Sequence, residues 1–363
     1  MVTIKHDIQM EDTEIYKVAS QFILDGNLIS IAPFGGGHIN DTFLVKTDNQ
    51  DQYILQKINK NVFKQPLHVI NNIEKLLNHF EKKGDNSLKT FKTSNGEKFV
   101  IDSKQDFWRM YNFVDGAQSF DIIQNKLQAF EAAKAFGEFQ LKTIDLDISE
   151  FYETIPDFHH LGKRYMKFDS VIANNPKNRI DITKNEIQFA YKHRKISDTI
   201  SELISAGKLP HRVTHNDTKL NNVLLHKQSG KGVCVIDLDT VMPGLVLYDY
   251  GDMVRTFTSP VAEDDKDFAK VHLRKEIFEE LTRGYLYHLS RVLTKNEKEN
   301  LLLGGKYMTL IMGLRFLTDY IEGDVYYKIK YEDHNLVRAK NQFALLDSIE
   351  AQEEDLKRII NNI

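Results

Sequence analysis

The stretch that decides the fold is VTHNDTKLNN, residues 213–222, followed by CVIDLD, residues 234–239. The first stretch has the spacing His-x-Asp-x-x-x-x-Asn, which ends at Asn222, and the second places Asp237 at the end of an apolar strand. Phosphoryl transfer from ATP needs a carboxylate that takes the proton of the acceptor hydroxyl. It also needs an amide oxygen and a second carboxylate that hold Mg²⁺. The spacing therefore predicts Asp217 as general base, with Asn222 and Asp237 as metal ligands.

Three further polar residues belong to these stretches. Lys219 is placed to meet the γ-phosphate or to steady the acceptor. Asp239 lies two residues after Asp237, so both carboxylates project from one face if the strand continues, and Asp239 is then a further metal ligand. His215 is expected to brace the loop through hydrogen bonds to the backbone. The alternative is an incidental polar turn, which the apolar strand and the preceding β-rich segment make less favourable.

Hydrophobic patterning divides the chain into a β-rich part and a helical part. Short apolar runs separated by glycine or polar turns predict antiparallel strands, and a three-and-four spacing predicts an amphipathic helix. The expected strands cover 28–33, 42–45, 53–55, 88–93, 99–102 and 107–114, and the helix covers 67–80. After residue 115 long helices are expected over 127–141 and 187–204, with one β-hairpin over 223–238. This order predicts an α+β fold with an N-terminal lobe, 1–114, a larger, mainly helical lobe, 115–363, and a cleft between them.

A glycine triplet, Gly35, Gly36 and Gly37, lies between the first two predicted strands. Glycines there let backbone N–H groups approach phosphates closely, although a triplet by itself is more often a flexible turn. Its position favours a nucleotide-binding loop that ends at Asn40. The sequence contains no Gly-x-x-x-x-Gly-Lys-Ser/Thr, so a P-loop is excluded as the nucleotide site.

A cation on the third strand is expected to steady the α- and β-phosphates. Lys57 is the candidate, with Glu74 on the following helix as its ion-pair partner. Gln56 is its neighbour, and because a one-residue step moves a side chain to the other face of a sheet, either residue can face the nucleotide. Glu74 can equally be a solvated charge on the helix surface.

Composition limits the classes of function. The 363 residues are 41% hydrophobic and 28% charged, with a formal net charge of -4, which is ordinary for a soluble globular protein and argues against a nucleic-acid partner. The only cysteine, Cys234, cannot form an intramolecular disulfide. No signal peptide is predicted, because the N-terminal stretch MVTIKHDIQMEDTEIY is polar and acidic. No membrane span is predicted, because Lys306 and Arg315 interrupt the most apolar stretch. These features favour a cytoplasmic protein without a membrane partner.

These motifs resemble the small-molecule kinases related to aminoglycoside phosphotransferases, which share the protein-kinase fold. A protein kinase is disfavoured because Asp-Leu-Asp, residues 237–239, replaces Asp-Phe-Gly. Within the family the sequence is most similar to the N-acetylhexosamine 1-kinases, over most of its length. The similar stretches are GGHINDT (36–42), QKIN (56–59), DTKLNN (217–222), DLDTVMP (237–243), DYGD (249–252) and RFLTDYIEGD (315–324). Lys57 departs from this pattern, since similar proteins often have arginine there.

The resemblance implies a bilobal, protein-kinase-like fold and ATP- and Mg²⁺-dependent phosphorylation of the anomeric hydroxyl of N-acetylglucosamine or N-acetylgalactosamine. It implies sugar contacts by Arg315, Tyr326 and His38, and Asp319 is a further candidate because a hexosamine pocket needs carboxylates, planar donors and aromatic faces. Two alternatives stay open. One is a kinase of the same fold that acts on choline, homoserine, an aminoglycoside or another sugar. The other is a non-catalytic module that binds nucleotide or a partner protein.

Overall fold

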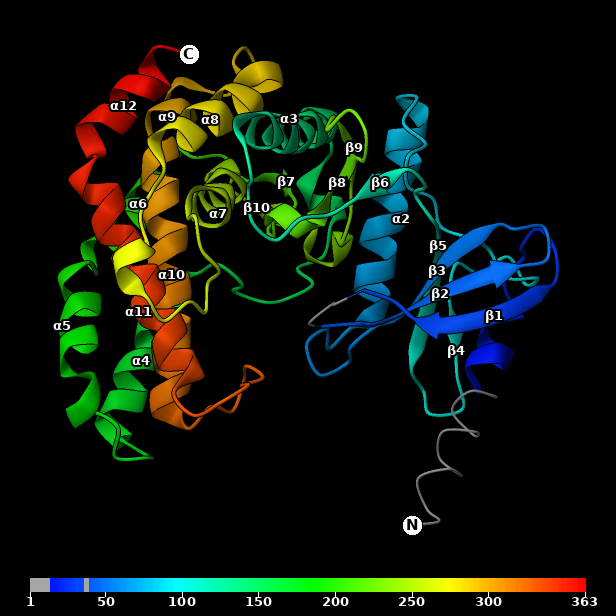
Figure 1. Cartoon of the computed structure of the whole chain (residues 1–363), viewed down its shortest axis with the longest axis horizontal. Coiled ribbons are helices and arrows are strands. Elements are labelled where there is room, and N and C mark those ends of the chain that lie inside the picture. The colour runs from blue at the N-terminus through cyan, green and yellow to red at the C-terminus, as the bar shows by residue number, and fades with distance from the viewer. Residues whose placement is uncertain (1–13, 36–38) are drawn as a thin grey trace. The chain divides into compact units, whose positions relative to one another are not determined.

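The computed structural model describes residues 14–35 and 39–363, which form two compact units. The first unit extends to Gly116 and also includes residues 151–155 and 238–241. The second unit contains the remaining residues from Ala117 onward. An antiparallel sheet dominates the first unit and helices dominate the second, so the predicted α+β class is confirmed (Figure 1).

The first unit is built on a five-stranded sheet with the order β1-β2-β3-β5-β4, in which all neighbours are antiparallel. Its strands are β1 (Leu28–Pro33), β2 (Asp41–Thr47), β3 (Gln52–Lys57), β4 (Val100–Ile101) and β5 (Phe107–Asn112). The strand expected over 88–93 is not formed, because those residues make only isolated bridges at Thr90 and Thr93. Alternating residues such as Val45, Leu55 and Met110 form the core beneath the sheet.

Helix α2 (Pro66–Lys82) explains why two remote segments belong to the first unit. Its buried positions recur at spacings of three and four, as the sequence predicts, and Pro66 occupies its first turn. On its buried side the Asn72 amide donates to the carbonyl oxygens of Tyr152 and Val241, both at 2.8 Å. Because these carbonyls are satisfied by the helix, segments 151–155 and 238–241 are fixed to it.

In the second unit the long helix α10 packs against most of the other helices, whereas α3 and α8 pack mainly against each other (Figure 1). Its α-helices are α3 (Lys126–Thr143), α4 (Leu161–Asn174), α5 (Lys184–Lys192), α6 (Lys195–Ser205), α7 (Val246–Thr258), α8 (Lys275–Leu289), α9 (Lys295–Glu299), α10 (Leu301–Glu322), α11 (His334–Ala351) and α12 (Glu353–Asn361). Its strands are β6 (Ala117–Gln118), β7 (Arg212–Thr214), β8 (Val223–His226), β9 (Gly232–Val235) and β10 (Met242–Gly244). Short 3-10 turns η1 (Ile148–Glu150), η2 (Asp181–Thr183), η3 (Leu220–Asn222) and η5 (Phe268–Lys270) occur in this unit, and η4 (Leu238–Thr240) occurs in the first.

The prediction of a single helix over 187–204 is wrong, because the structure has two helices there, α5 and α6, separated by a turn at residues 193–194. At the break the ring of His193 is buried, with Nδ1 2.8 Å from the Phe189 carbonyl oxygen and Nε2 3.1 Å from Glu350. The Phe189 contact is local, but the Glu350 contact comes from a helix distant in sequence, and local periodicity does not report it.

Helix α10 is long and apolar enough to span a membrane, but 78% of its most apolar window is buried inside the protein. That burial is typical of a core helix. It crosses α7 closely at Gly304, where an added Cβ would collide with the backbone carbonyl of Leu247. At the adjacent Gly305 an added Cβ would lie 3.1 Å from a methyl group of Val254. A side chain can move more easily than a backbone carbonyl, so the two glycines differ in tolerance.

We predict that Gly304→Ala lowers the free energy of unfolding by about 1–3 kcal/mol, because the helices must separate to admit the methyl group. Gly305→Ala is the matched control one residue along the same helix, with the same gain in helix propensity of about 1 kcal/mol. Its cost is expected to be smaller because the Val254 side chain can move where the Leu247 carbonyl cannot. Urea unfolding of both variants measures the difference. Equal stabilities would show that the close crossing does not constrain residue 304.

Candidate active site

The loop of residues 215–219 is held by a buried carboxylate on α7. Asp249 accepts hydrogen bonds from the backbone N–H of His215 at 3.0 Å and of Asn216 at 2.7 Å. The Thr218 hydroxyl donates to the Asp249 carbonyl oxygen at 2.5 Å. Asn216 has φ 63°, in the left-handed region that non-glycine residues rarely adopt. A single acidic residue thus fixes the two peptide groups that precede Asp217.

His215 braces this loop, as predicted. Its Nε2 lies 3.0 Å from the Ile236 carbonyl oxygen, and its Nδ1 accepts the backbone N–H of Asp217 at 3.2 Å. These partners require a neutral ring with the proton on Nε2. The ring is packed against the edges of Phe136 and Phe139. His215 therefore positions Asp217 and Ile236 together.

The structure brings Asp217, Lys219 and Asn222 into direct contact. The Lys219 ammonium is 2.9 Å from Oδ2 of Asp217, and the Asn222 amide donates to the same oxygen at 2.9 Å. The Asn222 amide also donates to the Asp217 carbonyl oxygen at 2.8 Å. Burial opposes ionisation of Asp217, but the charge of Lys219 and the hydrogen bonds from Lys219 and Asn222 outweigh it and lower the carboxyl pKa below its usual value. Asp217 is therefore an ionised, oriented hydrogen-bond acceptor at neutral pH.

Asp237 follows β9 at the point where the chain leaves the sheet. Val223 pairs with Val235 across the β8–β9 hairpin, and the backbone N–H of Ile236 donates to the Asn222 carbonyl oxygen at 2.9 Å. The hairpin thus places Asn222 and Asp237 at neighbouring loop ends, as predicted. Asp237 has φ 60°, and strained backbone of this kind is concentrated at functional sites. Its charge, with that of Asp217, helps to raise the Lys219 pKa against the effect of burial.

These residues fit the donor set expected for Mg²⁺. Within residues 14–35 and 39–363 no group of three or more His, Cys, Asp or Glu residues is placed to hold a metal ion. An amide oxygen of Asn222 and the carboxylate of Asp237 would instead be two oxygen ligands completed by phosphate oxygens, which is how Mg²⁺ is usually held in nucleotide sites. The metal roles of both residues stay predictions.

The premise for Asp239 as a further ligand is wrong. Strand β9 ends at Val235, and residues Leu238–Thr240 form a 3-10 turn, so no continuous strand places the two carboxylates on one face. Asp239 is only 2% exposed; its Oδ1 pairs with Arg109 and its Oδ2 accepts from the Asn40 amide at 2.7 Å. Because both oxygens bind protein donors, Asp239 is a structural carboxylate of the first unit.

The predicted Lys57–Glu74 ion pair is also absent from the described residues. Lys57 pairs with Asp41 at 2.9 Å, and Glu74 pairs with Lys98 at 3.3 Å. The pleat of β3 directs Lys57 to the face that carries Trp108, whose ring lies 5.7 Å from the ammonium. The glutamate is instead a partner of a lysine outside the strand.

Gln56, the alternative to Lys57, lies on the opposite face of β3. Its Oε1 accepts from Nη2 of Arg109 at 2.9 Å and from Nε at 3.3 Å. Arg109 sits directly across from it on β5. The buried cation of this sheet face is therefore an arginine on the neighbouring strand, which the sequence analysis did not identify.

Part of the predicted glycine loop lies outside the described residues, namely Gly36, Gly37 and His38. Gly35 has φ 74° and open space around its Cα. At the other end of the loop, Asn40 is buried; its Oδ1 accepts from the backbone N–H of Asn59 at 3.0 Å, and its amide donates to Asp239. The nucleotide contacts of this loop stay predictions.

Arg315 on α10 lies among three aromatic rings of the second unit. Its guanidinium carbon is 5.3, 5.8 and 5.6 Å from the ring centroids of Phe158, Tyr326 and Tyr327. Its hydrogen-bond partner among the described side chains is Sδ of Met312, at 3.6 Å. The predicted sugar contacts Arg315 and Tyr326 thus lie together, and the latter is 59% exposed.

Asp319, the third residue predicted on this helix, has a different role. Its carboxylate accepts the backbone N–H groups of Val325, Tyr326 and Tyr327 at 2.9, 2.8 and 3.0 Å, and the Asn335 amide at 2.9 Å. These four donors occupy both oxygens, so Asp319 shapes the turn that carries the tyrosines and is not free to bind a sugar. The direct-contact prediction for Asp319 is therefore corrected.

Two further arginines of the second unit have partly or fully buried partners. Arg164 donates to the carbonyl oxygens of Asp157 and Phe158, and burial followed by the charge of Arg315 lowers its pKa. On α7, Arg255 pairs with the buried Asp252 at 2.8 Å. Burial raises the pKa of Asp252, Arg255 opposes this, and the negative charge of Asp217 adds to it.

Sequence analysis missed the importance of Asp249 and Asp252. The signal was their i, i+3 spacing, which places both carboxylates on one face of a helix. Asp252 forms an ion pair with Arg255, three residues on along the same helix, and both side chains are buried.

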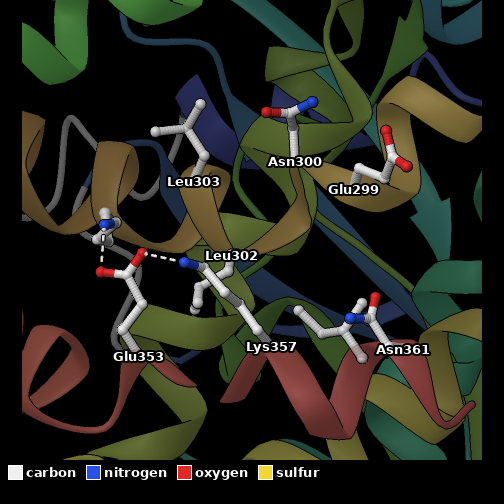
Figure 2. Close-up of a pocket in the computed structure, with 9 residues that line it drawn as sticks. Glu299, Asn300, Leu302, Leu303, Glu353, Lys357 and Asn361 are labelled. Atoms are coloured by element: carbon white, nitrogen blue, oxygen red, sulfur yellow. Dashed lines mark hydrogen bonds and ion pairs between the residues drawn. The ribbon is translucent and has the colours of Figure 1, made fainter. Parts of the chain in front are cut away.

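A separate cavity of about 370 Å³ lies between α12 and the start of α10 (Figure 2). Its lining cations, Lys306 and Lys357, both pair with Glu353 at 2.9 Å. None of the predicted site residues lines it. This cavity is therefore distinct from the candidate active site.

The family of the chain follows from comparison with known proteins. A model of the phosphotransferase enzyme family, APH, matches residues 30–283, well over half of the chain. The chain therefore belongs to this family of phosphotransferases.

Solved structures share the whole fold. An amicoumacin kinase in complex with AMP-PNP and Ca²⁺ aligns with a TM-score of 0.62 and 11% identity over 94% of this chain and 96% of that chain. A microcompartment-associated aminopropanol kinase aligns with a TM-score of 0.59 and 14% identity over 96% of this chain and 98% of that chain. A choline kinase from Streptococcus pneumoniae aligns with a TM-score of 0.54 and 14% identity over 94% of this chain and 99% of that chain. At such identities the likeness is one of fold.

Asp249 predicts a defined pH dependence of stability. Burial raises its pKa to about 7, whereas an unfolded aspartate titrates near 3.9. Between these values the folded protein holds a proton that the unfolded chain has lost, so this contribution is full below about pH 4 and is lost as the pH rises through about 7. Asp249→Asn removes this titration.

The stability advantage of the wild-type protein over Asp249→Asn is therefore expected to be largest near pH 4 and to decline toward pH 7. Urea unfolding across this range measures it, with the exposed Asp198→Asn as control. A difference that does not change with pH would contradict the raised pKa.

Proposed function

We propose that this protein transfers the γ-phosphoryl group of ATP to the anomeric hydroxyl of N-acetylglucosamine or N-acetylgalactosamine and releases the sugar 1-phosphate. The observation that carries the proposal is the Asp217 carboxylate, ionised and held by Lys219 and Asn222. Asn222, which contacts Asp217, is joined to the residue before Asp237 by the hydrogen bond from the Ile236 N–H to the Asn222 carbonyl oxygen. The similarity to N-acetylhexosamine 1-kinases supplies the acceptor.

In the proposed reaction the anomeric oxygen forms a bond to the γ-phosphorus as the bond from that phosphorus to the bridging oxygen of ADP breaks. Asp217 takes the hydroxyl proton. An anomeric hydroxyl belongs to a hemiacetal and is more acidic than an ordinary alcohol, so a carboxylate with a low pKa suffices when the oxygen is well aligned. The Lys219 ammonium orients Asp217 and is available to the transferred group.

Asn222 and Asp237 would hold Mg²⁺, which, when bound, neutralises charge on the phosphates of ATP. The amide nitrogen of Asn222 is used by Asp217, so its oxygen is the atom that a cation would bind. The amicoumacin kinase, solved with AMP-PNP and Ca²⁺, supports a nucleotide and divalent metal in this fold.

The charge of the acceptor region supports a neutral sugar over the cationic alternatives. Choline and aminopropanol, the acceptors named for two structural neighbours, and the amicoumacin of the third carry or contain amines. A cationic acceptor needs carboxylates or open aromatic faces. Here Arg315 already lies over three rings, and Arg164 adds a second guanidinium. A hydroxyl- and carbonyl-rich acceptor can instead accept hydrogen bonds from these arginines.

Asp217→Asn is expected to lower kcat by about 10²–10⁴-fold, because the proton acceptor is lost, while affinity for Mg²⁺-ATP stays within a few-fold of wild type. Steady-state kinetics and calorimetric titration with Mg²⁺-ATP measure the two quantities, with Asp198→Asn as a control at an exposed position. Wild-type turnover in Asp217→Asn would refute the assignment of the base.

Arg315→Ala is expected to raise the KM for the sugar by about 10–100-fold, the equivalent of one lost charged hydrogen bond, with the KM for ATP little changed. The exposed Arg291→Ala is the matched control. Product analysis by ³¹P NMR on a panel of hexosamines, hexoses and choline identifies the phosphorylated atom. A 6-phosphate or phosphocholine product would overturn the acceptor assignment.

A further inference from the structure

The residues immediately after Asp237 are fixed to the first unit by a buried polar network. Asp239, two residues on, pairs with Arg109 of β5 and accepts from the Asn40 amide at 2.7 Å. The Thr154 hydroxyl donates to the Asp239 carbonyl oxygen at 2.8 Å, and Asn72 of α2 donates to the Val241 carbonyl oxygen at 2.8 Å. Segment 238–241 therefore has side-chain and backbone attachments to several elements of the first unit.

Arg109 is the cation that pairs with Asp239 in this network, and both side chains are 2% exposed. Its fork also donates to Gln56 at 2.9 and 3.3 Å, which ties β3 to β5 through side chains. Its guanidinium carbon lies 5.2 Å from the Tyr111 ring centroid. A buried charge whose partner is removed costs several kcal/mol, so arginine and aspartate here depend on each other.

Asn40 connects this network to the glycine-containing loop. Its amide holds Asp239, while its oxygen accepts the backbone N–H of Asn59. The Asn59 amide in turn donates to the Ile39 carbonyl oxygen at 2.9 Å. The residues that end the loop and the segment that follows Asp237 are thus attached to the same carboxylate.

We propose that Arg109 is a positioning residue for phosphoryl transfer, which acts through Asp239 to fix the segment that follows Asp237 and the end of the glycine loop. The proposal rests on the phosphotransfer role of Asp237 but not on the identity of the acceptor. Arg109 itself contacts Asp239 and Gln56 and is not assigned a contact with substrate.

The test compares Arg109→Met, Arg109→Lys and wild type. Arg109→Met is expected to increase amide hydrogen exchange of peptides covering residues 236–242 and 39–42, to weaken binding of Mg²⁺-AMP-PNP by about tenfold, and to raise the Mg²⁺ concentration for half-maximal turnover. Arg109→Lys keeps the charge but not the planar fork, so it is expected to rescue these properties in part. Exchange and nucleotide binding need no acceptor, so they remain informative if the proposed sugar is wrong.

Lys306→Met is the control, because it breaks an ion pair with Glu353 in the C-terminal helices, and neither residue belongs to this network. It is expected to leave exchange at 236–242 and the Mg²⁺ requirement unchanged. If Arg109→Met does not fold, Asn40→Ala, which keeps the Arg109–Asp239 pair, is expected to show the same changes more weakly. Wild-type exchange and Mg²⁺ dependence in folded Arg109→Met, or loss of activity only in proportion to unfolded protein, would overturn the proposal.

Discussion

The buried carboxylate of Asp249 is the constraint on which the candidate active site depends. It accepts the N–H groups of His215 and Asn216 in the loop where Asn216 has a left-handed conformation. The next residue in this loop, Asp217, contacts Lys219 and Asn222. A carboxylate this buried prefers to be neutral, and its pKa is raised accordingly. Burial of this acid is unfavourable by itself, but its hydrogen bonds order the loop of residues 215–219. Such local costs are typical of functional sites.

In the first unit a buried carboxylate also holds a segment of the chain, but there it is paired with a cation. Asp239 is buried but has a guanidinium and an amide as partners, so its charge is compensated within the network of Arg109, Gln56 and Asn40. The two acidic residues of the Asp-Leu-Asp stretch, Asp237 and Asp239, therefore have different structural environments. Asp237 follows the hairpin in a strained backbone conformation, whereas Asp239 holds the chain to the sheet.

Several parts of this arrangement were accessible to sequence reasoning because they depend on short-range order. The five- and fifteen-residue spacings from Asp217 to Asn222 and from Asn222 to Asp237 correspond to one loop and one hairpin, and the hairpin pairing brings the ends together. The apolar spacing of α2 was readable for the same reason. The partners of Lys57, Glu74 and Asp319 could not be predicted from the sequence. The face of a sheet to which a side chain points, and the residues that a turn brings together, depend on contacts with residues distant in sequence.

By itself the sequence determined the α+β class, the hairpin and the identity of the polar groups at residues 217, 222 and 237, because periodicity and loop length are local properties. Only the tertiary structure decided that Arg109 rather than Lys57 is the buried cation, that Asp239 is bound by protein donors, and that Asp249 anchors the loop. The physical reason is that burial removes water as a partner. Each buried charge must then find its partner in space, and that partner can be almost two hundred residues away, as it is for Asn40 and Asp239.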